Sequence, residues 1–204
     1  MNTETLYLVV DLEATCDEDH AIPREQTEII EIGAVLVDGR TLQPLRELSV
    51  LVRPRLHPIT PFCTQLTSIT REMVANAPLF PEAIAACARW LGSDKPLLCS
   101  WGGYDRDQLR RDASRSGVRL PFGDRHLNLK ARFADAMELD REVGVGAALS
   151  KVGLRFEGRA HRGIDDARNI ARLLPWALGR RAPPKKAPEP PRSDREVMRA
   201  LLRR

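Results

Sequence analysis

Apolar runs alternate with polar connections in the N-terminal part of the chain, and this pattern predicts three consecutive strands. The run 6–10, LYLVV, is short, apolar and partly β-branched, which is typical of a strand buried on both faces. Because the connections are short, neighbouring strands are expected to pair in antiparallel fashion. The predicted strands cover residues 6–12, 28–38 and 45–53, with an acidic loop over 17–27.

From residue 80 onward, apolar positions recur at three- and four-residue intervals, which is the period of an amphipathic helix. Helices are predicted over residues 80–91, 104–116, 129–139, 144–152 and 163–178. Further strands near 96–101 and 125–129 alternate with them. Three antiparallel strands followed by alternating strands and helices predict an α/β domain with a mixed sheet and helices on its faces.

Two carboxylates lie at the end of the first predicted strand, in LVVDLEATC. Asp11 and Glu13 are two residues apart, so on a strand both side chains leave one face, about 6.6 Å apart at a rise of ~3.3 Å per residue. Oxygen ligands at this spacing suit Mg²⁺ or Mn²⁺. The alternatives are a solvated strand end and a phosphoacceptor domain of the receiver type, which would require a much shorter chain.

His161 and Asp166 lie five residues apart in HRGIDDARNIARLL. On a continuous helix this spacing rotates two side chains by about 140°, so both can face one site only if the histidine precedes the helix, with Gly163 as the break. Asp165 falls on the polar side of the predicted helix, which favours Asp166 as the inward carboxylate. The alternatives are a helix-start acid and a surface histidine without a role. The inward stripe consists of Asp166, Ile170, Leu173 and Ala177.

A fourth carboxylate follows another predicted strand, KPLLCSW. A glycine pair turns the chain, and the helix 104–116 begins. Asp105 is expected to face inward at the carboxyl end of this strand, where open α/β sheets place their ligand sites, whereas Asp107 points outward. The inward face consists of Asp105, Leu109, Ala113 and Ser116.

These residues predict a two-metal nuclease centre. Carboxylates repel phosphate unless divalent cations lie between them and hold both the attacking and the leaving oxygen. A histidine next to such cations would accept a proton from water at neutral pH, because imidazole has an ordinary pKa of about 6.5. The predicted site consists of Asp11, Glu13, Asp105, His161 and Asp166.

The same motifs resemble those of the DEDDh 3′-to-5′ exonucleases, and more narrowly the Eri-type branch of histone-mRNA and small-RNA trimming exonucleases with its bacterial relatives. The resemblance runs from about residue 6 to residue 178 and implies a ribonuclease-H-like fold. One departure is Ala160-His161, where related chains often carry two consecutive histidines, but His161 keeps its spacing to Asp166. The segments that carry the resemblance are DLEATC, EIIEIGAVLVD, FCTQLTSIT, SWGGYD, NLK and HRGIDDARNIARLL.

The resemblance also implies roles for individual residues. The four carboxylates would hold two Mg²⁺ ions, with Mn²⁺ as a substitute, and His161 would be the general base. Ala14 would lie against the terminal 3′-hydroxyl, Leu66 would wedge against the last base, and Trp101 would wall the nucleotide pocket. Leu66 and Trp101 could instead belong to the core. Stacking on an aromatic face tolerates any base, as a trimming nuclease requires.

Charge separates a body from a tail. The chain has a net charge of +4 and a pI of about 9.1. Residues 180–204 contain nine Lys or Arg and three acids, a net of +6, so residues 1–179 contain 23 bases and 25 acids, a net of −2. We expect an exonuclease domain over 1–179, followed by a basic, proline-rich linker and a short C-terminal helix over 180–204 that could bind nucleic acid, a partner protein or the domain itself, or act as a solubilising tail.

The sequence predicts neither a membrane span nor a secretion signal. No apolar run is long enough to span a bilayer, and no charged-then-apolar leader precedes the first strand. Four cysteines without close pairing or zinc spacing predict free thiols and a reducing, cytoplasmic setting.

The predicted function is therefore metal-dependent 3′-to-5′ hydrolysis of single-stranded RNA or DNA ends to nucleoside 5′-monophosphates, with RNA favoured through the Eri-type resemblance. One alternative is DNA 3′-end trimming or proofreading. A remote one is an inactive module that binds RNA ends or a protein. The oligomeric state is left open.

Overall fold

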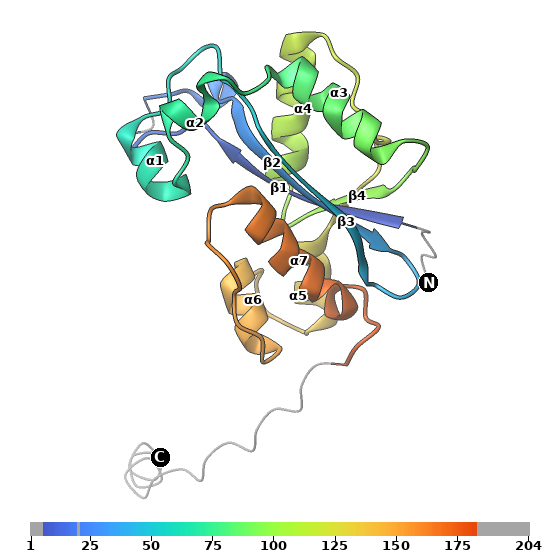
Figure 1. Cartoon of the computed structure of the whole chain (residues 1–204). Coiled ribbons are helices and arrows are strands. Elements are labelled where there is room, and N and C mark those ends of the chain that lie inside the picture. The colour runs from blue at the N-terminus through green and yellow to red at the C-terminus, as the bar shows by residue number, and fades with distance from the viewer. Residues whose placement is uncertain (1–5, 20, 183–204) are drawn as a thin grey trace, which may run out of the picture.

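The computed structural model describes residues 6–19 and 21–182 and builds them around one five-stranded sheet (Figure 1). The strand order is β3-β2-β1-β4-β5. The first three strands pair antiparallel, whereas β4 and β5 run parallel to β1, and this confirms the predicted mixed sheet. The strands are β1 (Leu6–Ala14), β2 (Ile29–Asp38), β3 (Pro44–Leu51), β4 (Leu97–Ser100) and β5 (His126–Asn128).

The five predicted helices are all present. The helix expected to end at residue 139 stops earlier, because Glu138 adopts the left-handed conformation with φ 50°. The helices are α3 (Phe80–Leu91), α4 (Tyr104–Ser116), α5 (Leu129–Ala136), α6 (Val145–Lys151) and α7 (Gly163–Ala177).

Two short helices, α1 (Pro61–Thr67) and α2 (Arg71–Ala75), were missed by the apolar periodicity, as was a 3₁₀ turn over Arg24–Gln26. Such short segments are too brief to show a stripe. Their start signals are nevertheless in the sequence, because the Thr60 and Thr70 hydroxyls accept hydrogen bonds from backbone N–H groups of the first turns.

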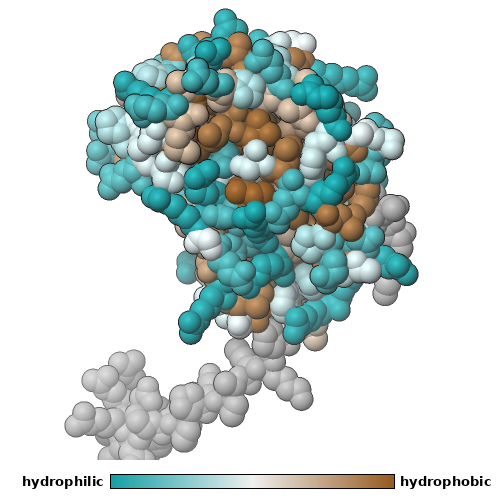
Figure 2. All heavy atoms as spheres, viewed as in Figure 1, coloured by the Kyte–Doolittle hydropathy of each residue, from teal (hydrophilic) through white to brown (hydrophobic). Residues whose placement is uncertain are grey.

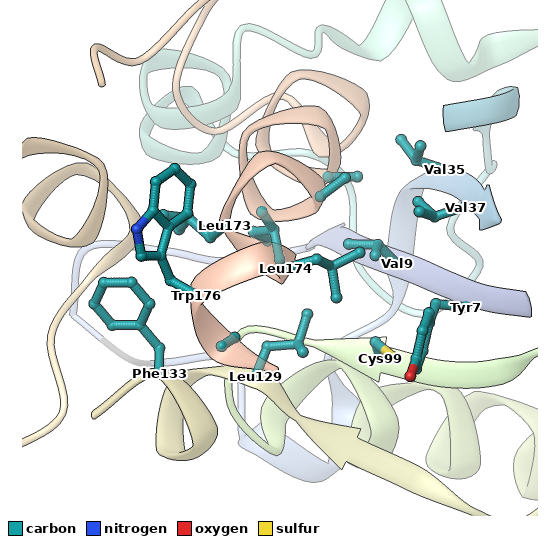
Figure 3. Packing of buried hydrophobic residues seen from close by; sticks show 14 of the residues in the cluster. Tyr7, Val9, Val35, Val37, Cys99, Leu129, Phe133, Leu173, Leu174 and Trp176 are labelled. Carbon is teal, nitrogen blue, oxygen red and sulfur yellow. The ribbon is translucent and has the colours of Figure 1, made fainter. Parts of the chain in front are cut away.

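Alternation along β1 sends its side chains into two cores. Leu8 and Val10 pack under α3 and α4, whereas Tyr7 and Val9 pack under α5, α6 and α7 (Figure 3). Both faces of the strand are therefore buried, as its continuous apolar run predicts. The next residues on the α7 side are Asp11 and Glu13, so the strand itself directs both carboxylates toward the N-terminal end of α7.

Figure 2 shows apolar surface between α2 and α3, whereas the surface over α6 and α7 is mostly hydrophilic. The edge strand β3 lies on this side of the molecule (Figure 1). The exposed first half of β3 carries two charged side chains, Arg46 and Glu47, beside the exposed Leu45. Arg46 pairs with Asp94, and Glu47 pairs with Arg168 of α7. Charged side chains on an edge strand discourage pairing with another chain.

The cysteines, the inner face of α4 and the C-terminal segment were each the subject of a prediction. All four cysteines are free, as predicted. On α4, Asp105, Leu109 and Ala113 are buried, but the prediction for Ser116 is wrong: it is exposed, because it is the last residue of the helix, directly before the Gly117 C-cap. In the described parts of the chain, no helix has the length and apolar character needed to cross a bilayer. The predicted C-terminal helix and most of the segment 180–204 lie outside the described residues.

Candidate active site

Three of the predicted carboxylates meet at the carboxyl end of β1. Asp11, Glu13 and Asp166 each present an oxygen atom within 4.8 Å of the others. Asp11 and Glu13 come from one face of β1, and Asp166 comes from the first turn of α7. Hard oxygen donors this close together are suited to a divalent metal ion.

Asp105 approaches the same place from the first turn of α4. Its side chain is buried, and its Oδ1 accepts a hydrogen bond of 3.1 Å from the backbone N–H of Leu12, the residue between Asp11 and Glu13. This bond ties the start of α4 to the end of β1. Asp107 is partly exposed and pairs with Arg106 instead, so the helical stripe distinguished the two acids correctly.

The crowding of these acids raises their pKa values. Burial, followed by the charges of Asp105 and Asp166, raises the pKa of Asp11 well above its ordinary value. Burial and the nearby Asp166 raise the pKa of Glu13 to about 8. Burial raises the pKa of Asp105 to about 6, although the Leu12 N–H opposes the shift. The ionised forms of these acids therefore repel one another, and positive charge at this place would favour ionisation.

His161 lies directly before α7, which begins at Gly163. The prediction that the histidine precedes the helix is confirmed. Its backbone is left-handed with φ 61°, and its side chain is exposed rather than packed in the core. Burial raises the pKa of Asp166, and hydrogen bonds from the backbone N–H groups of His161 and Arg162 partly offset this rise. The segment that carries His161 therefore lies against the Asp166 carboxylate.

A buried acid that was not predicted, Glu31 of β2, holds this segment in place. Its Oε2 accepts hydrogen bonds of 3.0 Å from Arg162 Nε and from the backbone N–H of Gly163, and its Oε1 lies 3.1 Å from Arg162 Nη2. The Ser49 hydroxyl donates to Oε1 at 3.1 Å. Glu31 is fully buried, so its charge depends on Arg162 for compensation.

Backbone contact completes this junction between β2 and α7. A Cβ atom added to Gly33 would lie 2.0 Å from the carbonyl carbon of Gly163. Only glycine at position 33 permits α7 to begin this close to the sheet. Gly163 in turn lies next to Asp11, because a Cβ atom added to Gly163 would lie 2.9 Å from the Asp11 carbonyl oxygen. The close approach sets how far Asp166 reaches toward β1.

A cavity of about 570 Å³ lies beside the carboxylates, and we call it the Ala14 cavity. Two of the predicted substrate residues, Ala14 at the end of β1 and the partly exposed Leu66 of α1, line it. Phe62 of α1 and Tyr104 of α4 line it as well, and neither was predicted. The Arg24 guanidinium lies 6.0 Å from the centre of the Tyr104 ring.

Trp101 lies elsewhere. Its ring packs 5.6 Å from that of Phe133, and its Nε1 donates a 2.9 Å hydrogen bond to the carbonyl of Val143. It is absent from the described residues that line the Ala14 cavity, where Tyr104 provides the aromatic side chain. The role expected for Trp101 as a wall of the nucleotide pocket stays a prediction.

Sequence comparison places the chain among known nucleases. A family model described as an exonuclease (RNase_T) matches residues 8–174. "ERI1 exoribonuclease 3" of Homo sapiens is 31% identical over 179 residues, covering 82% of this chain and 52% of the relative. "3'-5' exonuclease Snipper" of Drosophila melanogaster is 31% identical over 196 residues, covering 85% of this chain and 69% of the relative.

The human "3'-5' exoribonuclease 1" is 31% identical over 175 residues, which are 81% of this chain and 50% of the relative. The chain thus spans about half the length of the two exoribonucleases. Among solved structures, the nuclease domain of 3'hExo, described as a DEDDh family member bound to rAMP, matches with a TM-score of 0.79 and 29% identity. The match covers 87% of this chain and 93% of that domain, and it confirms the predicted ribonuclease-H-like fold.

Proposed function

The chain belongs to the exonuclease family, and from this premise we propose that it is a divalent-metal-dependent 3′-to-5′ exonuclease that releases nucleoside 5′-monophosphates from single-stranded ends, with RNA preferred. The observation that carries the proposal is the approach of Asp11, Glu13 and Asp166 oxygens to within 4.8 Å of one another, with His161 at the adjoining start of α7. All five positions predicted for catalysis carry the required residue types, which argues against an inactive module.

The donor set fits divalent cations. Asp11, Glu13, Asp105 and Asp166 would hold two Mg²⁺ ions, or Mn²⁺ in their place, directly or through water. When bound, the ions supply charge stabilisation at the scissile phosphate and a more acidic attacking water. The raised pKa values of these acids support the assignment, because four carboxylates at one place need positive charge to remain ionised.

His161 would act as the general base. Its side chain is exposed, whereas the segment that carries it is anchored by Glu31, so the imidazole can meet solvent and substrate from a fixed support. It would accept a proton from the attacking water. The family resemblance and the position of His161 directly before α7 support this role.

The Ala14 cavity would hold the 3′-terminal nucleotide. Ala14 has no bulk to exclude a terminal sugar, and Leu66, which is 37% exposed, offers an apolar edge to the last base. Phe62 and Tyr104 add aromatic surface that any base can contact. A cavity that recognises shape rather than base edges suits an enzyme that removes successive nucleotides of any sequence.

The preference for RNA rests on the relatives. Two of them are named exoribonucleases, and one similar structure, with a TM-score of 0.79 and 27% identity, is described as 3'-end specific recognition of histone mRNA stem-loop by 3'-exonuclease. That match covers 87% of this chain and 64% of the other. The alternative substrate is DNA, since the relative Snipper is named only a 3'-5' exonuclease.

Competition between labelled substrates tests the proposal. Single-stranded RNA and DNA oligonucleotides of one sequence, each 5′-labelled with a different dye, are mixed in one reaction with Mg²⁺. We expect both to shorten stepwise and the RNA to be consumed first, with Asp11→Asn inactive on both. Faster loss of the DNA would support DNA end trimming instead. Equal behaviour of the wild type and Asp11→Asn would refute catalysis at this site.

A further inference from the structure

A second cavity, of about 810 Å³, lies on the α3 and α4 side of the sheet. It is bounded by α3, by β4, by one side of α4 and by the segment 118–124 that leads from α4 toward β5. We call it the basic cavity. It shares no lining residue with the Ala14 cavity.

Positive charge is concentrated at its rim. The lining contains Lys95, Arg106, Arg110 and Arg119, against the single acid Asp124. Residues 1–179 as a whole contain 23 bases and 25 acids, so this grouping is a local separation of charge on a nearly balanced domain. Such a patch attracts polyanions and is weakened by salt.

Part of this charge has no internal partner. Arg106 pairs with its neighbour Asp107 at 2.8 Å. Lys95 and Arg119, in contrast, form no ion pair with any residue in the described ranges 6–19 and 21–182. The positive charge of the cluster is also felt by the nearby His126. Burial is the largest cause that lowers its pKa to about 4, and the charges of Arg106 and Arg110 are the next largest.

The floor of the basic cavity is apolar. Leu98 and Ala113 are buried beneath it, and Val118, Leu120 and Phe122 line it while half-buried. An apolar floor with an aromatic residue and a cationic rim matches a nucleotide, because the base covers apolar surface while the phosphate meets the cations. Small acidic metabolites lack the apolar part, and apolar ligands lack the charge.

The two cavities lie on different sides of the first turn of α4. Tyr104 lines the Ala14 cavity, Asp105 belongs to the carboxylate site, and Arg106 lines the basic cavity. Tyr104 and Arg106 are only about 3 Å apart along the helix axis but point about 200° apart, so a strand that reaches both cavities would pass around the start of α4. We propose that the basic cavity binds the single-stranded substrate upstream of its 3′-terminal nucleotide, through its phosphates and unpaired bases. This inference rests on the proposed function and adds a length-dependent binding site to it.

Kinetics on substrates of different length test the inference. The double variant Lys95→Glu/Arg119→Glu alters two rim residues that lie outside the carboxylate site. For a 12-nucleotide RNA we expect KM to rise about tenfold with kcat unchanged, whereas a dinucleotide keeps wild-type constants. Removing two phosphate contacts should also make the slope of log KM against log salt shallower by about 1.4, at ~0.7 per contact on a single strand.

Two control variants separate this effect from general charge and from misfolding. Arg132→Glu/Lys151→Glu makes the same change in net charge at exposed positions of α5 and α6 and should behave as wild type. Lys95→Arg/Arg119→Lys keeps the charge and should keep the affinity. The inference is overturned if the first control raises KM as much, if the dinucleotide suffers equally, or if Lys95→Glu/Arg119→Glu leaves the 12-mer unaffected.

Binding can be measured without catalysis, so the two proposals fail separately. Fluorescence anisotropy of the same 12-mer in EDTA requires no turnover, and Lys95→Glu/Arg119→Glu should weaken binding about tenfold. If the wild type cleaves nothing but this difference persists, the proposed function fails and the basic cavity stands. If cleavage is normal but the anisotropy of the two proteins is equal, the basic cavity fails alone.

Discussion

Glu31→Gln tests how the fold supports His161, the proposed general base. The substitution keeps the size of the side chain but removes its charge. One amide oxygen can still accept from Arg162 Nε and from the Gly163 N–H, which both bond to Oε2 in the wild type. The amide NH₂ then faces Arg162 Nη2, a donor, where Oε1 accepted at 3.1 Å. The ion pair is lost, and two donors oppose each other.

The expected loss of stability is about 2 kcal/mol. Removing one partner of a fully buried ion pair costs roughly 3–5 kcal/mol. Arg162 is 25% exposed, so water relieves part of that cost, and the retained hydrogen bonds relieve more. For a domain of this size, about 2 kcal/mol corresponds to a fall in Tm of roughly 4–8 °C.

The activity should fall further than the stability suggests. Gly163 and Arg162 fix the segment that carries His161, and a displacement of about 1 Å at a reacting group costs up to ~10²-fold in rate. We expect kcat on single-stranded RNA to fall at least about tenfold, with Mg²⁺ affinity by calorimetry close to that of the wild type. Tm is measured by scanning calorimetry on the same samples.

Glu47→Gln is the matched control. Glu47 also pairs with an arginine of α7, Arg168 at 2.6 Å, but the two side chains are 38% and 48% exposed. Exposed pairs contribute at most about 1 kcal/mol, and Glu47 bonds to Arg168 rather than to Arg162 or Gly163. Equal effects of the two variants on kcat, or unchanged kcat in Glu31→Gln, would refute the claim that Glu31 positions the histidine.

Three further predictions follow from the site. His161→Ala should lower kcat by about 10²–10⁴-fold while Mg²⁺ binding by calorimetry persists, and parallel loss of metal would mean that His161 is a ligand. In EDTA, the Tm should fall as the pH rises from 5 to 8, because folding raises the pKa of Glu13 from 4.5 to about 8 and the folded state therefore binds more protons than the unfolded state in this range. Glu13→Gln should make Tm depend less on pH. Equal dependence of Tm on pH in the two proteins would contradict the pKa shift. Gly33→Ala should cost about 3 kcal/mol in urea unfolding because its Cβ meets Gly163 at 2.0 Å, whereas Gly146→Ala, in open space on α6, should be neutral or stabilising.

The elements of this fold were largely predictable from the chain. The strand β1 opens with five consecutive apolar residues, 6–10, and α7 shows a long helical stripe, so the sequence pattern predicted both elements. The same periods oriented the acids, because alternation on β1 sends Asp11 and Glu13 to one side and the helical repeat turns Asp166 inward. Helices α1 and α2 were not found, since five to seven residues hold too few turns.

The supporting residues were not predictable in the same way. Glu31 lies within an otherwise apolar strand, and only the register of β2 against β1 and the approach of α7 reveal that it meets Arg162, 131 residues away. Tyr104 directly precedes Asp105, yet its place in the Ala14 cavity depends on α1, a helix that the periodicity missed. Long-range packing, which no local pattern encodes, decides both.

The most direct test of the central claim is a time course on a single-stranded RNA labelled in parallel at its 5′ end and within its 3′-terminal nucleotide. With Mg²⁺ we predict that the 3′ label appears at once as nucleoside 5′-monophosphate, while the 5′-labelled strand shortens one nucleotide at a time. Both events should be absent in EDTA and in Asp11→Asn. Internal fragments, release of the 5′ label first, or full activity of Asp11→Asn would contradict a metal-dependent 3′-to-5′ exonuclease at this site.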